Sequence, residues 1–179
     1  ETSARWRFSW QKQSQRTRDD HDALWRLFRV AATTNAPAAA WAGVLNASAA
    51  LRVVAVRSYS GDWDCFSMQQ GRNTWLYRPP GDDRFLFLHW DSDEAFVTGQ
   101  PFYGKRVQAW VEHPSLLRIL HRYVRELVRL TSREPERLAA WLAAERAASA
   151  PSVIQANYAN FFRLRAAEAE AWLAETERE

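Results

Sequence analysis

The chain has little of the chemistry that holds small folds together by cross-links. It contains a single cysteine, Cys65, among 179 residues, so neither a disulfide framework nor a cysteine-based zinc site can form within it. Only 6 glycines and 7 prolines are present, which excludes collagen-like and linker-like sequences. No apolar run approaches the roughly 18 residues of a membrane span, so we expect no transmembrane helix.

Lysine is almost absent. Lys12 and Lys105 are the only two lysines, and the remaining basic residues are arginines. The formal net charge is +3, but acidic residues lie between the basic ones along the chain. Nucleic-acid-binding proteins usually gather their basic residues into a patch or stripe. We therefore expect no nucleic-acid partner.

The composition is that of a globular protein, with 47% hydrophobic and 25% charged residues. A chain of this length is the size of one ordinary domain and buries roughly 70% of its unfolded surface without help from a metal. We therefore expect one domain over residues 1–179.

Helical periodicity dominates both ends of the chain. Asn46 and Ser132 are residue types that cap helix N-termini, and Pro114 suits a first helical turn. The predicted helices cover residues 21–33, a short alanine-rich stretch after Pro37, and the segments that follow Asn46, Pro114, Ser132 and Pro151. The last of these is a long helix over residues 152–179, whose end from residue 166 onward we expect to fray.

The middle of the chain holds most of the strand signals. Residues 74–77 form a short aromatic strand, and residues 84–90 form a second strand apolar enough to be buried on both faces. The turn residues Pro79 to Asp83 lie between them, so the two strands predict a hairpin. Residues 5–10 alternate arginine and serine with aromatics and predict a further strand. The predicted fold class is α+β: a mostly helical body with one small β-hairpin.

Residues 61–99 are also acidic, with seven acids against three arginines in a chain of net positive charge. Asp91 and Asp93 follow the second strand two residues apart, so extended backbone would put both side chains on one face. Paired carboxylates of this kind suit Mg²⁺, Mn²⁺ or Ca²⁺. The alternative is that Asp91-Ser92-Asp93 is a turn that caps the next segment.

Asp62 and Asp64 flank Trp63, where burying an unpaired carboxylate would be costly. Either they cap the following segment or one of them is functional. Asn73 enters the first strand as a turn residue or as a ligand. The histidines show no zinc-binding spacing, and no nucleophile elbow or phosphate-binding glycine loop is present.

Three motifs occur in a fixed order: Asp62-Trp63-Asp64, then Asn73 to Tyr77, then His89 to Val97 with its Trp-Asp-x-Asp-x-x-Phe run. In this order they resemble the spore coat kinase family, the CotH-like proteins, whose fold is similar to that of protein kinases. The resemblance continues weakly through the neighbouring helices. His89 and Val97 depart from the proline and glycine usual in the family.

The resemblance implies an ATP-dependent kinase that transfers phosphate to a Ser or Thr hydroxyl of a protein substrate. Asp64 would orient the hydroxyl and accept its proton. Asp91 and Asp93 would hold the Mg²⁺ or Mn²⁺ ion that bridges the ATP phosphates. Asn73 would complete the metal or phosphate shell, and Trp63 and Trp90 would wall the site.

The resemblance also implies a kinase-like C-lobe whose β-hairpin carries the metal-site loop. The N-lobe, with its phosphate-pairing lysine, would lie upstream, so we expect a catalytically incomplete portion of a longer bacterial protein that is secreted or surface-located. Two alternatives remain: a pseudokinase or protein-binding module, and another metal-dependent hydrolase or transferase that uses Asp91 and Asp93.

Overall fold

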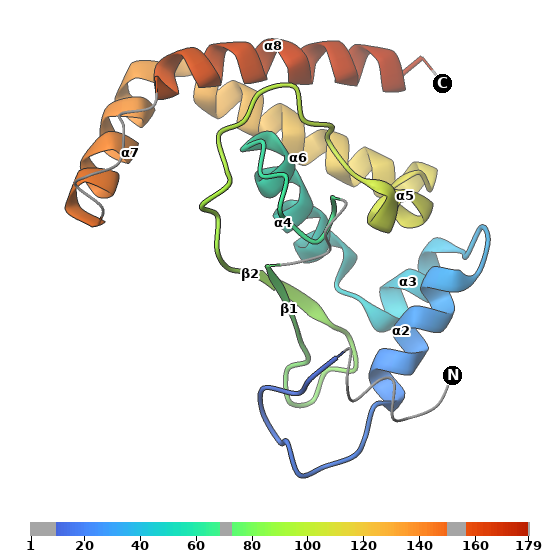
Figure 1. Cartoon of the computed structure of the whole chain (residues 1–179). Coiled ribbons are helices and arrows are strands. Elements are labelled where there is room, and N and C mark those ends of the chain that lie inside the picture. Colours follow the sequence, from blue (N-terminus) through green and yellow to red (C-terminus); the bar gives the residue numbers. More distant parts are fainter. Residues whose placement is uncertain (1–9, 69–72, 150–156, 179) are drawn as a thin grey trace.

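The computed structural model describes residues 10–68, 73–149 and 157–178 (Figure 1). The predicted strand over residues 5–10 lies almost wholly outside them. The described residues form helices and one two-stranded antiparallel sheet, so the predicted α+β class is confirmed. The elements are α2 (Asp22–Ala32), α3 (Ala38–Val44), α4 (Ala47–Tyr59), β1 (Thr74–Tyr77), β2 (Leu86–His89), α5 (Lys105–Val111), α6 (Pro114–Arg133), α7 (Pro135–Ser149) and α8 (Tyr158–Thr176).

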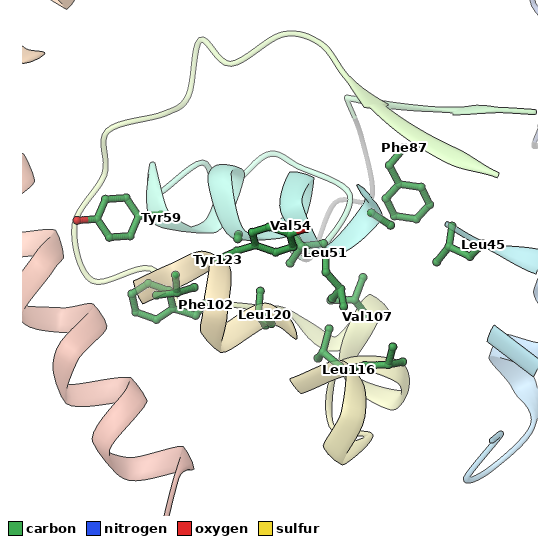
Figure 2. Packing of buried hydrophobic residues seen from close by; sticks show 14 of the residues in the cluster. Leu45, Leu51, Val54, Tyr59, Phe87, Phe102, Val107, Leu116, Leu120 and Tyr123 are labelled. Carbon is green, nitrogen blue, oxygen red and sulfur yellow. The ribbon is translucent and has the colours of Figure 1, made fainter. Parts of the chain in front are cut away.

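Helices α4 and α6 pack against each other at the centre, and α8 lies across α6 (Figure 1). Figure 2 shows Leu51 and Val54 of α4 beside Leu120 of α6, all of them buried. The buried residues of α6 recur at i, i+4 spacing, which puts them on one face of the helix. Burying each such side chain contributes about 1.5–3 kcal/mol. Among the described helices, none combines the length and the apolarity needed to cross a membrane.

The hairpin covers the core with one face only. β1 and β2 pair in a register that sets Trp75 opposite Leu88. Phe87 is 6% exposed and packs into the core, whereas Leu88 is 46% exposed. The expectation that the second strand is buried on both faces is therefore wrong, because successive side chains point to opposite faces and the core lies under one of them.

The helix signals were confirmed in part. Asn46 caps α4, since its Oδ1 accepts a hydrogen bond from the N–H of Ala49 at 3.1 Å. Pro114 begins α6 as expected. Ser132 does not cap a helix, because α6 runs through it to Arg133 and α7 begins at Pro135, where a proline suits the first turn.

The last helix differs from its prediction at both ends. It begins at Tyr158, and residues 152–156 lie outside the described residues. It does not fray from residue 166, because Ala169 and Leu173 are buried in the core and hold the helix in place to Thr176.

Arg165 of α8 joins this helix to the end of α4. Its side chain is 1% exposed and donates hydrogen bonds to the carbonyls of Ser58 at 2.6 Å and Tyr59 at 3.1 Å. Carbonyls in the last turn of a helix have no partner within the helix. The carbonyl of Ser58 also accepts a hydrogen bond from the N–H of Gly61 at 2.9 Å, whereas Arg165 supplies the donor for the carbonyl of Tyr59. Burial lowers the pKa of Arg165, and Glu168 opposes this effect.

His121 of α6 is buried where this helix packs against α8. Its Nε2 lies 2.9 Å from the hydroxyl of Thr176, and its ring packs edge-on against Trp172. Burial lowers the pKa of His121, and Arg125 lowers it further, although Glu177 lies 3.8 Å from Nδ1. In the folded state the imidazole therefore takes up its proton at lower pH than in the unfolded chain.

We expect the melting temperature to fall as the pH is lowered through about 6.5, the unfolded pKa of histidine. In that window the unfolded chain binds more protons than the folded one, which lowers the free energy of unfolding. His121→Gln, which keeps a hydrogen-bonding side chain, should lose less stability between pH 7.5 and 5.5. Calorimetric melting of both proteins measures the difference, and parallel pH profiles would contradict it.

Candidate functional site

The candidate site is built where α4 ends, around the side chain of Arg57. Its Nη2 lies 2.5 Å from Oδ2 of Asp62, and the two side chains are 3% and 1% exposed. Removing two charges from water costs several kcal/mol for each ion, so the attraction within the pair and its further hydrogen bonds must offset this cost. The sequence pattern marks Asp62 as a candidate but gives no sign of Arg57, because an arginine in a last helical turn is ordinarily exposed.

The guanidinium of Arg57 also holds backbone from two other segments. It donates hydrogen bonds to the carbonyls of Trp90 at 2.8 Å, Asp91 at 3.1 Å and Asn73 at 3.4 Å. The N–H of Trp90 in turn donates to the carbonyl of Asn73 at 3.2 Å. One buried side chain therefore brings together all three motifs that the sequence placed in order.

Asp64 and Asn73 are in direct contact. Nδ2 of Asn73 donates to the carbonyl of Asp64 at 3.0 Å and to its carboxylate Oδ2 at 3.4 Å. The other carboxylate oxygen, Oδ1, is buried without a hydrogen-bond partner in the described part of the chain. Buried polar atoms are nearly always paired, so this oxygen can accept a donor brought by a ligand. The carboxylate oxygens of Asp62 also lack a well-oriented hydrogen bond among the described residues, but Asp62 has the ion pair with Arg57.

Asp91 and Asp93 lie on the rim of the site with exposed side chains. The expectation that they share a strand face is wrong, because β2 ends at His89 and Asp91 has a left-handed backbone with φ of 57°. A turn follows, in which the N–H of Ala95 donates to the carbonyl of Ser92. The two carboxylates therefore leave a loop rather than a strand.

Asp62 links the two halves of the site electrostatically. Burial raises the pKa of Asp62, and the negative charges of Asp64 and Asp93 raise it further. Arg57 and the N–H of Asp64 oppose this rise. Asp93 of the 91–95 loop and Asp64, which is bonded to Asn73, are thus both close enough to Asp62 to affect its pKa.

The described residues could bind a divalent cation only if water or a substrate supplied part of its ligands. Where the structure describes the chain, no three His, Cys, Asp or Glu side chains lie close enough to enclose a metal ion. Mg²⁺ is commonly held by one or two carboxylates, with water and substrate phosphates as its remaining ligands. A cation bound by the exposed carboxylates of Asp91 and Asp93 would therefore need further ligands from water or phosphate.

Gly61 lets the loop after α4 lie against the segment that follows the acidic pair. Its φ is +65°, and an added Cβ would lie 1.8 Å from the carbonyl oxygen of Val97. The N–H of Phe96 donates to the carbonyl of Ser60 at 2.6 Å, and the Phe96 ring packs against Tyr158 and Phe161 of α8. The loop with the acidic pair is therefore fixed at both ends.

A cavity of about 570 Å³ lies beside the site, with Trp63 in its wall. Nε1 of Trp63 donates to Oε2 of Glu94 at 3.2 Å, so the indole ring stands between this cavity and the 91–95 loop. Sequence analysis did not predict the cavity, because most of its lining comes from a segment without any motif. The lining includes Met68, Gln100, Tyr103, Lys105, Gln108 and Glu112.

A family model described as "CotH kinase protein" matches residues 3–126. The matched residues include the loop of Asp62 and Asp64, the hairpin and the 91–95 loop. The match ends within α6, and α7 and α8 follow it. No curated protein and no solved structure matches the chain.

Removing one member of the buried ion pair should be strongly destabilising. Arg57→Met leaves the Asp62 carboxylate buried without its cation, and we expect a loss of about 3–5 kcal/mol in the free energy of unfolding. Adding Asp62→Leu should recover a large part of this loss, because no charge then remains buried. Urea unfolding of the single and double variants gives the coupling, and strictly additive losses would contradict a paired role.

Gly61→Ala should destabilise the protein more than Gly99→Ala does. Both glycines have positive φ, so an alanine is strained at either position, at a cost of about 1 kcal/mol. At Gly61 the new Cβ also meets the backbone of Val97, whereas a Cβ added at Gly99 has no atom within 4 Å. The same unfolding measurement compares the two, and equal losses would show that Val97 does not constrain the loop.

Proposed function

The chain belongs to the CotH kinase family, and from this premise we propose that it supplies the catalytic and cation-binding residues for phosphate transfer from ATP to a Ser or Thr hydroxyl of a protein. The observation that carries this proposal is the convergence of the three motifs on Arg57. Phosphoryl transfer depends mainly on positioning and on charge stabilisation, which such a rigid arrangement can supply.

Asp64 acts on the acceptor hydroxyl in this proposal. One of its carboxylate oxygens is held by Asn73, and the other has no partner within the described residues. The free oxygen accepts a hydrogen bond from the hydroxyl and takes its proton as the hydroxyl oxygen bonds to the γ-phosphorus of ATP. The bond from that phosphorus to the β–γ bridging oxygen breaks at the same time, and ADP leaves. A base placed in this way typically contributes about 10²–10⁴ in rate.

Asp91 and Asp93 hold the divalent cation, Mg²⁺ or Mn²⁺, and Asn73 completes the metal or phosphate shell. When bound, the cation neutralises charge on the ATP phosphates. Asp62 stays out of the ligand set, because it is buried and paired with Arg57. Its role is to keep the loop of Asp64 at a fixed distance from the 91–95 loop.

The proposal includes the relation to protein kinases: the chain corresponds to a C-lobe, and a second lobe would complete the nucleotide site. The exposed aromatic face of the hairpin supports this assignment. Trp75 and Trp90 are 47% and 53% exposed, with ring centroids 6.5 Å apart. They lie beside Asn73 and Asp91, where the walls of a nucleotide site are needed.

Two substitutions in the natural full-length protein separate the proposed roles. Asp64→Asn should lower phosphate transfer by about 10²–10⁴ while leaving the affinity for Mn²⁺–ATP nearly unchanged, because only the proton acceptor is lost. Asp91→Asn should weaken both, because it removes a charge that faces the cation. Transfer of labelled phosphate to protein and calorimetric titration with Mn²⁺–ATP measure the two effects.

Asp82→Asn is the matched control, since Asp82 is an acid of the same segment whose partner is Arg84 in the hairpin turn. Arg84 holds the pKa of Asp82 at about 2, so Asp82 carries a charge at neutral pH, and its substitution should affect neither measurement. ATP binding without transfer would favour a pseudokinase or binding module. Release of phosphate to water without protein labelling would favour a hydrolase.

A further inference from the structure

Helix α6 carries a stripe of arginines along its exposed side. At 3.6 residues per turn the five side chains fall within an arc of about 80° and extend over about 22 Å of helix. All five residues are exposed, and the arc lies opposite the face that packs against α4 and α8. The arginine stripe consists of Arg118, Arg122, Arg125, Arg129 and Arg133.

Few anions within the chain compensate this stripe. Arg125 forms an ion pair with Glu177, and Arg118 donates a hydrogen bond to the hydroxyl of Ser115. Arg122, Arg129 and Arg133 have no carboxylate partner among the residues that the structure describes. Glu126 is the only acid in α6.

The spacing makes the stripe costly for the helix. Like charges three or four residues apart destabilise a helix, and successive members of the stripe are all separated by three or four residues. Arg52 of α4 adds to the positive charge, because its guanidinium and that of Arg122 both lie over the ring of Tyr123. A bound anion would relieve this repulsion.

The shape of the stripe narrows the choice of anion. Glu126 borders the arc and Glu177 contacts Arg125, so the positive surface is narrow and has acids beside it. A flat anionic membrane would also contact Glu126 and Glu177, whose negative charges would repel it. Single-stranded nucleic acid is usually bound on exposed aromatic rings, but the one aromatic residue of α6, Tyr123, is buried.

We propose that the arginine stripe docks an extended, aspartate- and glutamate-rich segment of a partner protein. Side chains on one face of an extended peptide recur about every 6.6 Å, and arginines four residues apart on a helix are separated by about 6 Å. Acidic residues at alternate positions therefore meet successive guanidinium groups, each of which binds carboxylates through paired N–H donors. The stripe lies on the face of α6 opposite the one that packs against α4, and none of its residues belongs to the site proposed for phosphate transfer.

A fluorescein-labelled eight-residue peptide with glutamate at alternate positions and serine between them tests the proposal by fluorescence anisotropy. The triple variant Arg122→Gln, Arg129→Gln, Arg133→Gln should bind this peptide at least about tenfold more weakly than the unaltered protein, as expected for the loss of three charge-assisted contacts. Its melting temperature should rise, because repulsion along α6 is removed.

The matched control is Arg16→Gln, Arg18→Gln, Arg26→Gln, which removes the same charge from exposed positions outside α6. Its affinity should change less than about twofold if local contacts rather than net charge carry the binding. Equal losses in the two triple variants would overturn the proposal, as would the absence of binding by the unaltered protein. Tighter, stripe-dependent binding of an eight-residue oligothymidylate or of phosphatidylserine vesicles would overturn the choice of partner.

Discussion

The candidate site depends on the buried ion pair of Arg57 and Asp62. Each charge alone would be expensive to bury, and the pair is retained with three backbone carbonyls on the same guanidinium. These contacts fix a helix end, a strand start and a strand end relative to one another. Asp64 and the 91–95 loop are therefore placed by a residue that has no need to touch a substrate itself.

A second buried arginine, Arg165 of α8, contacts the same end of α4. Arg165 satisfies the last carbonyls of the helix, while Arg57 pairs with the loop that leaves it. Between them lies Gly61, which allows the backbone of Val97 to approach closely. The two arginines and the absence of a side chain at Gly61 therefore fix the positions of the acidic loops.

Local signals predicted local structure well. Asn46 and Pro114 each act through neighbouring backbone, and both helix starts were confirmed. Ser132 failed as a cap because α6 continues through it to Arg133, with Thr131 buried in the same turn, and such burial outweighs a weak local preference. Neither Arg57 nor Arg165 could be predicted, since their burial depends on carbonyls far away in sequence. The left-handed backbone of Asp91 could not be predicted either. The expected geometry of Asp91 and Asp93 was therefore wrong, although both residues lie at the site.

The position of Arg165 has a consequence for where this unit can be divided. The family match ends at residue 126, inside α6, yet the guanidinium that satisfies the carbonyls of Ser58 and Tyr59 comes from α8. A chain cut at the end of the match would lose the Arg165 donor to the carbonyl of Tyr59, would leave Ser58 only its bond from the N–H of Gly61, and would uncover the side of α6 that α8 now shields. The residues that the family model matches are therefore fewer than those that form this fold. Helix α8 contributes to the architecture of the site although no sequence motif marks it.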